Sequence, residues 1–326
     1  MSSPDTSGPS ANPGGPARPA SIRDVARVAG VSPGTVSKVL NRHPGIATAT
    51  RERVLAASRE LDYRPNEMAR GIFARRSFTV GLITSDSFGR FSGPIMAGAE
   101  AALGAGKLSV IMADSHGDAQ RERQQIAALR GRRIDGLIVT GRCSNPRPPV
   151  GQQLPFPVVY AHTPSDDPDD CSIMVDDEQA GRLAAEHLLA AGRRRIAHIT
   201  GPWDFDAVRL RLHGFREVLD GHGIAPVGEV KAGFWCESWG RDTVRQLLDE
   251  VPDLDAIYCG SDLLARGALD GLREAGRSVP DDVAVMGTDN WKLIALAARP
   301  PLTTIDLDLH EVGRRAAQLL LEAIGG

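Results

Sequence analysis

The chain has 326 residues and a formal net charge of −3, with 42% hydrophobic and 24% charged residues. At roughly 150 residues per domain, this length predicts two domains, with room for a small third one. No apolar run approaches the roughly 18–20 residues that span a bilayer. The first 20 residues also lack the apolar stretch of a secretory signal. The composition therefore excludes a membrane protein.

The four cysteines lie far apart and form no CxxC pair; they are Cys143, Cys171, Cys236 and Cys259. This usage suits a reducing compartment better than a disulfide framework. We therefore expect a cytoplasmic protein, and no cofactor is expected.

The charge is distributed unevenly along the chain. Residues 1–76 carry twelve Lys and Arg against six Asp and Glu, a net charge of +6, whereas the remainder carries a net charge of −9. A basic segment on a larger acidic body is typical of a protein in which one part meets a polyanion such as nucleic acid. Chance clustering of surface charge is the alternative explanation.

The first 76 residues predict a tail, a compact helical head and a linker. Residues 1–20 are rich in Pro, Gly and Ser and read as a disordered tail. Helical spacing, with Ser21 and Ser32 as N-caps and Gly30 as a stop, then predicts helices over 22–29, 33–41 and 48–61. The buried residues of the last two helices are expected to be Val36, Val39, Leu40, Val54, Leu55, Ala57 and either Ser58 or Leu61. The stretch 67–76 has few apolar residues and reads as a linker.

From Phe78 onward, apolar strands alternate with helical patterns. Strands are predicted at 79–84, 108–113, 135–140, 158–161, 172–175, 195–200, near 229–232, 256–259 and 283–286. Helices are predicted around 94–104, 121–129, 179–189, 207–219, 241–248, 263–274 and 311–324. This alternation predicts an α/β fold with parallel sheets covered by helices on both faces. Some 250 residues are many for one such sheet, so we expect a two-lobed body with a cleft.

The segment 22–41, IRDVARVAGVSPGTVSKVLN, has the spacing of two helices joined by a glycine-containing turn. In such a unit the second helix can enter the major groove of DNA. Thr35, Ser37 and Lys38 fall on or beside its exposed face, while apolar residues anchor the other face. Helical hairpins are common, so this spacing alone leaves a purely structural role open.

The residue string is more specific than its spacing. DVARVAGVSPGTVSKVLN resembles the signature D-V-A-x-x-A-G-V-S-x-x-T-V-S-x-V-L-N of the LacI/GalR (lactose-repressor) family of transcriptional regulators. The resemblance continues in TRERVLAASRELDYRPNEMAR and in later landmarks such as AIYCGSDLLARGALDGLREAGRSVPDDVAVMGTDN and PPLTTID. It covers nearly the whole chain. It implies a helix-turn-helix head, a hinge helix and a two-lobed, periplasmic-binding-protein-like body.

The resemblance also implies which residues contact DNA. Base edges would be met by Pro33, Gly34 and Lys38, of which only Lys38 can donate side-chain hydrogen bonds to guanine. Phosphates would be held by Ser32, Thr35, Ser37, Asn41 and Tyr63. In the hinge, the DNA-contacting set is Asn66, Ala69 and Ile72, with Ile72 as the apolar wedge in the minor groove. Ala47 stands where the family has a capping serine, so Thr48 becomes the candidate cap of the third helix.

In the body, the resemblance places an effector among Asp86, Phe91, His162, Arg211, Trp235, Ser261 and Asp289. Aromatic faces, a planar guanidinium and carboxylates form a set suited to a sugar. His162, Ser261 and the pair Gly89-Arg90 depart from the residues usual in the family. Taken one at a time, the aromatic residues could be core, and Arg211 could be a surface ion pair with Glu217 or Asp206.

The sequence does not support an enzyme or a metal-binding protein. There is no P-loop, GxSxG or HExxH motif, and no GxGxxG after a strand. The acidic run 165–170 lacks the glycine and glutamate of an EF-hand. Four histidines, His187, His198, His213 and His222, have no metal-ligand spacing and are predicted to be surface or hydrogen-bonded residues.

We therefore expect a homodimeric regulator, a repressor of a carbohydrate-related operon, that binds a palindromic double-stranded DNA operator under control of a small effector, with a sugar as the expected class. The predicted parts are a tail (1–20), a helix-turn-helix domain (21–65), a hinge (66–77) and an effector-binding and dimerisation body (78–326). Two alternatives stay open. One is a sugar receptor of the periplasmic type, which would need an export signal and no head. The other is a DNA-binding regulator without effector control.

Overall fold

The computed structural model describes residues 20–41, 43–63, 77–105 and 108–325. The chain divides into two compact units, Met1–Arg75 and Arg76–Gly326, called here the head and the body. Almost all of the predicted tail, 1–20, and of the predicted hinge, 66–77, lies outside the described residues, including the hinge residues Asn66, Ala69 and Ile72.

The described residues of the head form three short helices, α1 (Ile22–Ala29), α2 (Pro33–Leu40) and α3 (Thr48–Glu60). Ser21 caps α1 in a reciprocal capping box with Asp24, and Gly30 ends the helix at φ 63°, a left-handed backbone that favours glycine. Val25, Val36 and Val54, one from each helix, are fully buried against one another in a small apolar core. The helices predicted for the head are therefore confirmed.

Two predictions for α3 were wrong. Thr48 does not cap the helix, because it is already the first helical residue; Ala47 occupies the cap position and makes no side-chain hydrogen bond. Leu55 is 41% exposed, because the helical turn of about 100° per residue carries it away from buried Val54. Ser58 is buried instead, and its hydroxyl donates to the Val54 carbonyl oxygen at 2.9 Å.

The described part of the body forms two five-stranded sheets in which every pair of neighbouring strands is parallel. The first sheet has the order β2-β1-β3-β4-β5, from β1 (Thr79–Thr84), β2 (Ser109–Asp114), β3 (Gly136–Thr140), β4 (Val158–Ala161) and β5 (Cys171–Ile173). The second has the order β10-β9-β8-β6-β7, from β6 (Ile196–Thr200), β7 (Lys231–Ala232), β8 (Ala256–Cys259), β9 (Ala284–Thr288) and β10 (Thr303–Ile305).

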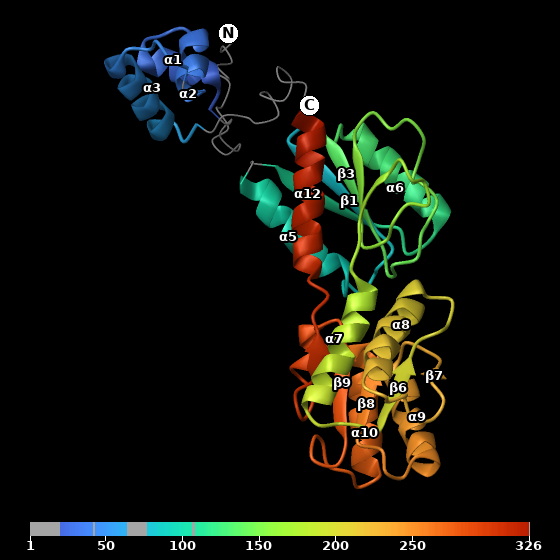
Figure 1. Cartoon of the computed structure of the whole chain (residues 1–326). Helices are drawn as coiled ribbons and strands as arrows, with labels where there is room; N and C mark the ends of the chain where they lie inside the picture. Colours follow the sequence, from blue (N-terminus) through green and yellow to red (C-terminus); the bar gives the residue numbers. More distant parts are fainter. Residues whose placement is uncertain (1–19, 42, 64–76, 106–107, 326) are drawn as a thin grey trace, which may run out of the picture. The chain divides into compact units, whose positions relative to one another are not determined.

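Helices cover both sheets and define two lobes (Figure 1). The first lobe carries α5 (Ser92–Ala105), α6 (Ala119–Gly131) and α12 (Leu309–Gly325). The second carries α7 (Asp177–Ala190), α8 (Asp206–Gly221), α9 (Glu237–Glu250), α10 (Asp262–Glu274) and α11 (Lys292–Ala295). The predicted α/β class with two lobes is confirmed. The short elements α11 and β10 were not predicted.

Close helix packing fixes the position of α8. A side chain at Gly181 of α7 would place its Cβ 2.0 Å from the Arg211 carbonyl oxygen, and one at Gly214 of α8 would meet the Glu178 carbonyl oxygen at 2.0 Å. Only glycine fits this approach, so α7 and α8 touch along their backbones. This contact brings Arg211 next to the start of α7.

Among the described residues, no helix is both long enough and apolar enough to cross a membrane.

Candidate functional site

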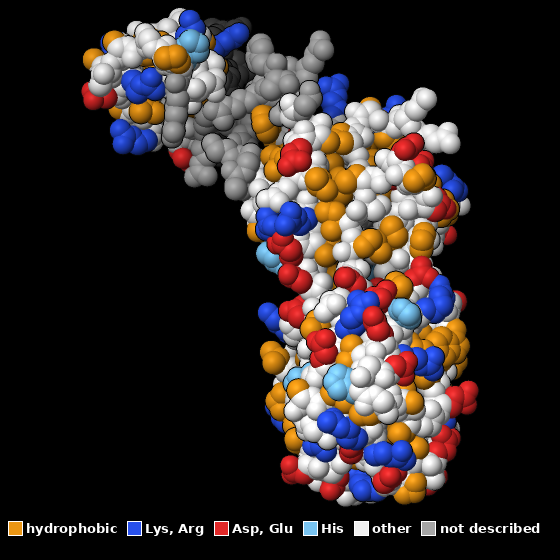
Figure 2. Space-filling model, in the orientation of Figure 1, with side chains coloured by type: hydrophobic (Ala, Val, Ile, Leu, Met, Phe, Trp, Pro, Cys, Tyr) orange, Lys and Arg blue, Asp and Glu red, His pale blue; other side chains and the backbone are white. Residues whose placement is uncertain are grey.

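The head presents the predicted DNA-contacting face of α2 to solvent. Pro33, Gly34 and Lys38 are exposed, whereas Val36 and Val39 are buried. Figure 2 shows Lys and Arg side chains spread over the visible face of the head. A helix anchored by its apolar face with a cation on the opposite face has the geometry needed to approach DNA.

The predicted phosphate-binding residues surround the same helix. Ser32 caps α2 by accepting the Thr35 backbone N–H at 3.1 Å, and the two hydroxyl groups lie 3.0 Å apart. Asn41 donates from its amide to the Ser37 hydroxyl at 3.4 Å. Tyr63 is partly buried and packs on the head core. Asn66, Ala69 and Ile72 lie outside the described residues.

In the body, a cavity of about 630 Å³ is lined by residues from both lobes. Six of the seven predicted effector residues line it: Asp86, Phe91, His162, Arg211, Trp235 and Asp289. Ser261 does not. It is fully buried, and its hydroxyl caps α10 by accepting the Leu264 N–H at 3.3 Å, which occupies the oxygen that was predicted to meet a ligand.

The cavity walls are rich in aromatic side chains. Phe91 stacks on His162 with ring centroids 4.7 Å apart, and Phe205 meets Trp235 edge-on at 5.7 Å. A Cβ at Gly201 would lie 2.0 Å from the Trp235 ring, so glycine is required there for the indole to take this position. Phe91 and Trp235 were predicted from the sequence, whereas four further aromatic residues of the wall were not: Phe88, Phe205, Phe234 and Trp291.

Arg211 enters the cavity from α8 as a buried ion pair. Its guanidinium lies 2.6 Å from the Asp177 carboxylate and donates to the Gly260 carbonyl oxygen at 2.8 Å. Burial acts to lower the pKa of Arg211, but the Asp177 and Asp289 carboxylates outweigh it and the pKa is raised. The alternative of a surface pair with Glu217 or Asp206 was wrong, because those carboxylates pair with other arginines.

Asp177 was not predicted from the sequence. It stands in the first turn of α7, where acidic residues are common for reasons of helix electrostatics alone. The carboxylate is 1% exposed and also accepts a hydrogen bond from the Ser144 hydroxyl at 2.9 Å. Ser144 and Arg211 both line the cavity, so Asp177 supports two wall residues from behind.

His162 and Asp86 are buried polar residues of the wall. Neither ring nitrogen of His162 has a hydrogen-bond partner, and burial lowers its pKa to about 4, so the ring is neutral at pH 7. The Asp86 carboxylate accepts the backbone N–H groups of Phe91 and Ser92 at 2.7 and 2.9 Å, which holds the start of α5 against the cavity. Asp86 thus has a structural task beside the predicted contact with an effector.

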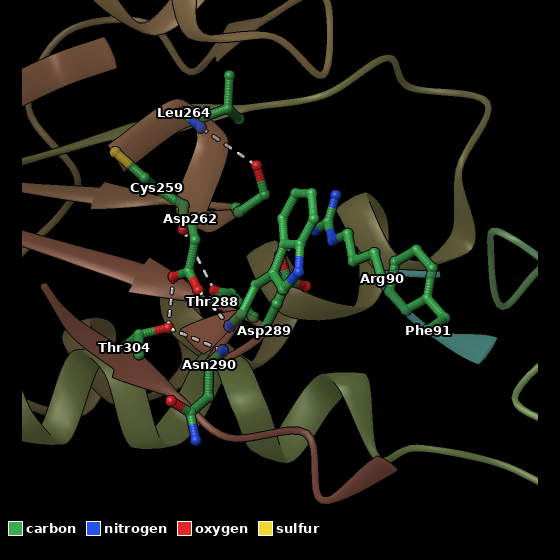
Figure 3. Close-up of polar contacts among 12 residues, drawn as sticks. Arg90, Phe91, Cys259, Asp262, Leu264, Thr288, Asp289, Asn290 and Thr304 are labelled. Atoms are coloured by element: carbon green, nitrogen blue, oxygen red, sulfur yellow. Dashed lines mark hydrogen bonds and ion pairs between the residues drawn. The ribbon is translucent and has the colours of Figure 1, made fainter. Parts of the chain in front are cut away.

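Asp289 forms an ion pair with Arg90 across the two lobes (Figure 3). Asp289 follows β9 with φ at 115°, and its N–H donates to the Ile305 carbonyl oxygen of β10 at 2.9 Å. Burial raises the pKa of Asp289. Arg90 was noted in the sequence only as a departure from the family pattern, and the structure places it on the cavity wall.

Asp262 holds the segment after Asp289. Its carboxylate accepts the Trp291 N–H at 2.7 Å. It also accepts the Thr304 hydroxyl at 2.6 Å, a contact that Figure 3 shows. The side chain is fully buried, and this burial, with the nearby Asp289 charge, raises its pKa to about 7. Asp262 does not line the cavity but fixes the backbone of Trp291, which does.

In the part of the chain that the structure describes, no group of three or more His, Cys, Asp or Glu residues is placed so that it could hold a metal ion. Two of the four histidines singled out in the sequence, His198 and His222, hydrogen-bond to backbone carbonyl groups as predicted. In the acidic run 165–170, Ser165 donates its hydroxyl to Asp170 at 2.6 Å, a contact within the loop.

Comparison with protein-family models finds two matches. Residues 21–66 match the model of bacterial regulatory proteins of the lacI family, and residues 185–326 match a periplasmic binding protein-like domain.

Similar proteins match along almost the whole chain. The HTH-type transcriptional regulator CelR of Thermobifida fusca is 36% identical over 311 residues, which cover 93% of this chain and 91% of that protein. The ribose operon repressor of Escherichia coli (strain K12) is 34% identical and covers 94% of this chain and 93% of its own length.

Solved structures agree with these relatives. A complex of transcriptional regulator CelR with cellobiose is 34% identical with a TM-score of 0.65, covering 94% of both chains. The lac repressor dimer bound to operator and the anti-inducer ONPF is 29% identical with a TM-score of 0.74, covering 95% of this chain and 94% of its own. Each of these proteins matches both the head and the body.

Proposed function

The chain belongs to the LacI family of bacterial regulatory proteins, and on that premise we propose that it is a transcriptional repressor controlled by a sugar. It binds a palindromic operator as a homodimer, and the sugar binds in the body cavity. The main support for an effector is that six of the predicted effector-binding residues line one cavity of about 630 Å³.

The proposal for DNA rests on the head. Lys38 is exposed on α2 and can donate to guanine, whereas Pro33 and Gly34 offer only apolar or backbone contacts. The lac repressor structure that matches this chain is a dimer bound to operator, which supports the same partner and assembly here. The segment that matches the lacI family model, 21–66, also disfavours a periplasmic receptor, which needs no DNA-binding head.

The proposal for a sugar rests on the chemistry of the cavity wall. Aromatic rings can cover the apolar face of a pyranose, while Arg211, Asp86 and Asp289 can bind neighbouring hydroxyl groups. Relatives in complex with cellobiose, or named for the ribose operon, support this class of effector. We propose a neutral sugar, with cellobiose as the first candidate, because CelR is also similar in sequence over almost the whole chain.

The test has two steps. Selection of bound sequences from a random DNA library by the full chain should yield a palindrome, and titration of that DNA gives the operator affinity. Cellobiose, ribose and a panel of other neutral sugars are then added. A sugar that changes operator affinity supports the proposal; a palindrome bound with equal affinity in every sugar would favour the regulator without effector control.

A further inference from the structure

The Arg90–Asp289 ion pair joins the two lobes, whose sheets are separate. Arg90 lies between β1 and α5 of the first lobe, whereas Asp289 follows β9 of the second, 199 residues later. Their side chains are only 13% and 2% exposed. A charge pair shielded from water in this way is screened little by salt and interacts more strongly than a surface pair.

Aromatic rings from both lobes hold the Arg90 guanidinium in place. Its central carbon lies 4.7 Å from the centroid of the Phe91 ring in the first lobe and 6.0 Å from that of Trp291 in the second. Arginine is attracted to aromatic faces at such distances. The backbone of Asp289 is fixed as well. Its N–H donates to the Ile305 carbonyl oxygen of β10, and the N–H of Trp291, two residues later, donates to the Asp262 carboxylate.

The ion pair leaves two polar atoms unsatisfied. Neither Nε of Arg90 nor Oδ1 of Asp289 has a hydrogen-bond partner, although both atoms are buried. Leaving such buried groups unpaired is unfavourable. A ligand with neighbouring hydroxyl groups can relieve both, because a hydroxyl can donate to the carboxylate and accept from the guanidinium. An apolar ligand can do neither.

We propose that Arg90 is a specificity-determining residue of the cavity. Paired with Asp289, it clamps the two lobes together, and a ligand reaches the carboxylate only by bridging or displacing this pair. The clamp therefore selects polar, hydroxyl-bearing ligands even though the cavity walls are largely aromatic. The clamp rests on the contact between Arg90 and Asp289 within the body, so it does not depend on which sugar is the effector.

The clamp can be tested without a ligand, by hydrogen–deuterium exchange of the full chain. Each lobe carries amides that report on it: those of Phe91 and Ser92, bonded to Asp86, in the first lobe, and that of Asp289, bonded to Ile305, in the second. Arg90→Gln should speed exchange at Asp289, and Asp289→Asn should speed exchange at Phe91 and Ser92, each by on the order of tenfold.

The effect on the opposite lobe separates a clamp from local packing. If each substitution speeds exchange only in its own lobe, the clamp is refuted. The double variant Arg90→Gln/Asp289→Asn should match the single variants, since removing one partner already removes the pair, whereas additive effects would also refute it. Arg209→Gln is the matched control, because Arg209 pairs with Asp206 within α8, and it should leave the amides of both lobes unchanged.

Discussion

The guanidinium of Arg211 and the carboxylate of Asp177 form an ion pair of 2.6 Å in which the two side chains are 5% and 1% exposed. The two residues lie on consecutive packed helices, α8 and α7; Arg211 lines the cavity, and Asp177 lies behind it. The pair therefore has two tasks. It presents a planar donor to the cavity, and it neutralises a carboxylate that would otherwise be buried alone.

Arg211→Ala should destabilise the body as well as abolish the response to an effector. Removing one partner of a buried pair leaves an uncompensated charge, which costs about 3–5 kcal/mol. Thermal or urea unfolding measures this loss. The double variant Arg211→Met/Asp177→Leu removes both charges and should lose clearly less stability than Arg211→Ala. If the two variants are equally destabilised, the buried charge of Asp177 is not the cause.

Lys38→Ala should weaken binding to the selected operator by about 1–3 kcal/mol and relax the preference for one base pair, because Lys38 is the residue of α2 that can read guanine. Operator affinity measured at two salt concentrations checks this. The control is Arg59→Ala, a cation exposed on α3, which should leave base preference unchanged. Unaltered affinity and preference in Lys38→Ala would remove Lys38 from the reading face.

Ile72→Ala should reduce binding to the operator far more than binding to random DNA. An apolar wedge acts only where the duplex is kinked, and the kink belongs to the specific site. Competition between operator and random duplexes gives the ratio of the two affinities. An equal loss on both kinds of DNA would show that Ile72 contributes only general packing or hinge stability.

Sequence patterns predicted the parts of the body that have long apolar runs. The strands at 79–84, 158–161 and 256–259 were placed to the residue, since each is a continuous apolar run bounded by breakers. By contrast, β10 is three residues long with two threonines, and α11 is a single turn, so neither shows a period. Elements this short form because their neighbours hold them.

The cavity was predicted in part for a similar reason. Landmarks shared with the family located six wall residues, whereas the partners of those residues are particular to the fold of this chain. Asp177 lies 34 residues from Arg211, and only the glycine contact between α7 and α8 brings them together. Arg90 lies 199 residues from Asp289, and their pairing depends on how the two lobes close. No local sequence pattern predicts either contact.

Operator and effector should influence each other reciprocally. Whatever factor a sugar imposes on operator affinity, the operator must impose on the affinity for that sugar, because both follow from one coupling free energy, typically 1–3 kcal/mol. Titration calorimetry of the active sugar with and without operator measures the second factor. A discrepancy beyond experimental error would mean that the sugar acts on a site or an assembly other than the one titrated.

Asp262→Asn should change how stability depends on pH. In the folded body the Asp262 pKa is about 7, whereas an unfolded aspartate has a pKa of about 3.9. The folded state thus holds this proton more tightly, and the stability that the protonated side chain contributes below pH 4 is lost as the pH rises through 7. Asparagine carries no charge at any pH and can still accept the Trp291 N–H while its amide donates to Thr304.

Relative to wild type, the Asp262→Asn variant should therefore gain stability between pH 5 and 8, by on the order of 2–4 kcal/mol if the whole shift is expressed. Urea unfolding of both proteins at several pH values gives this difference. Asp282→Asn serves as the control, because Asp282 is an exposed carboxylate whose pKa is lowered by the Ser278 hydroxyl and backbone N–H, so it stays ionised across this window. A difference between Asp262→Asn and wild type that does not vary with pH would show that Asp262 is already ionised in the folded body at pH 5, and that its contacts with Trp291 and Thr304 outweigh its burial.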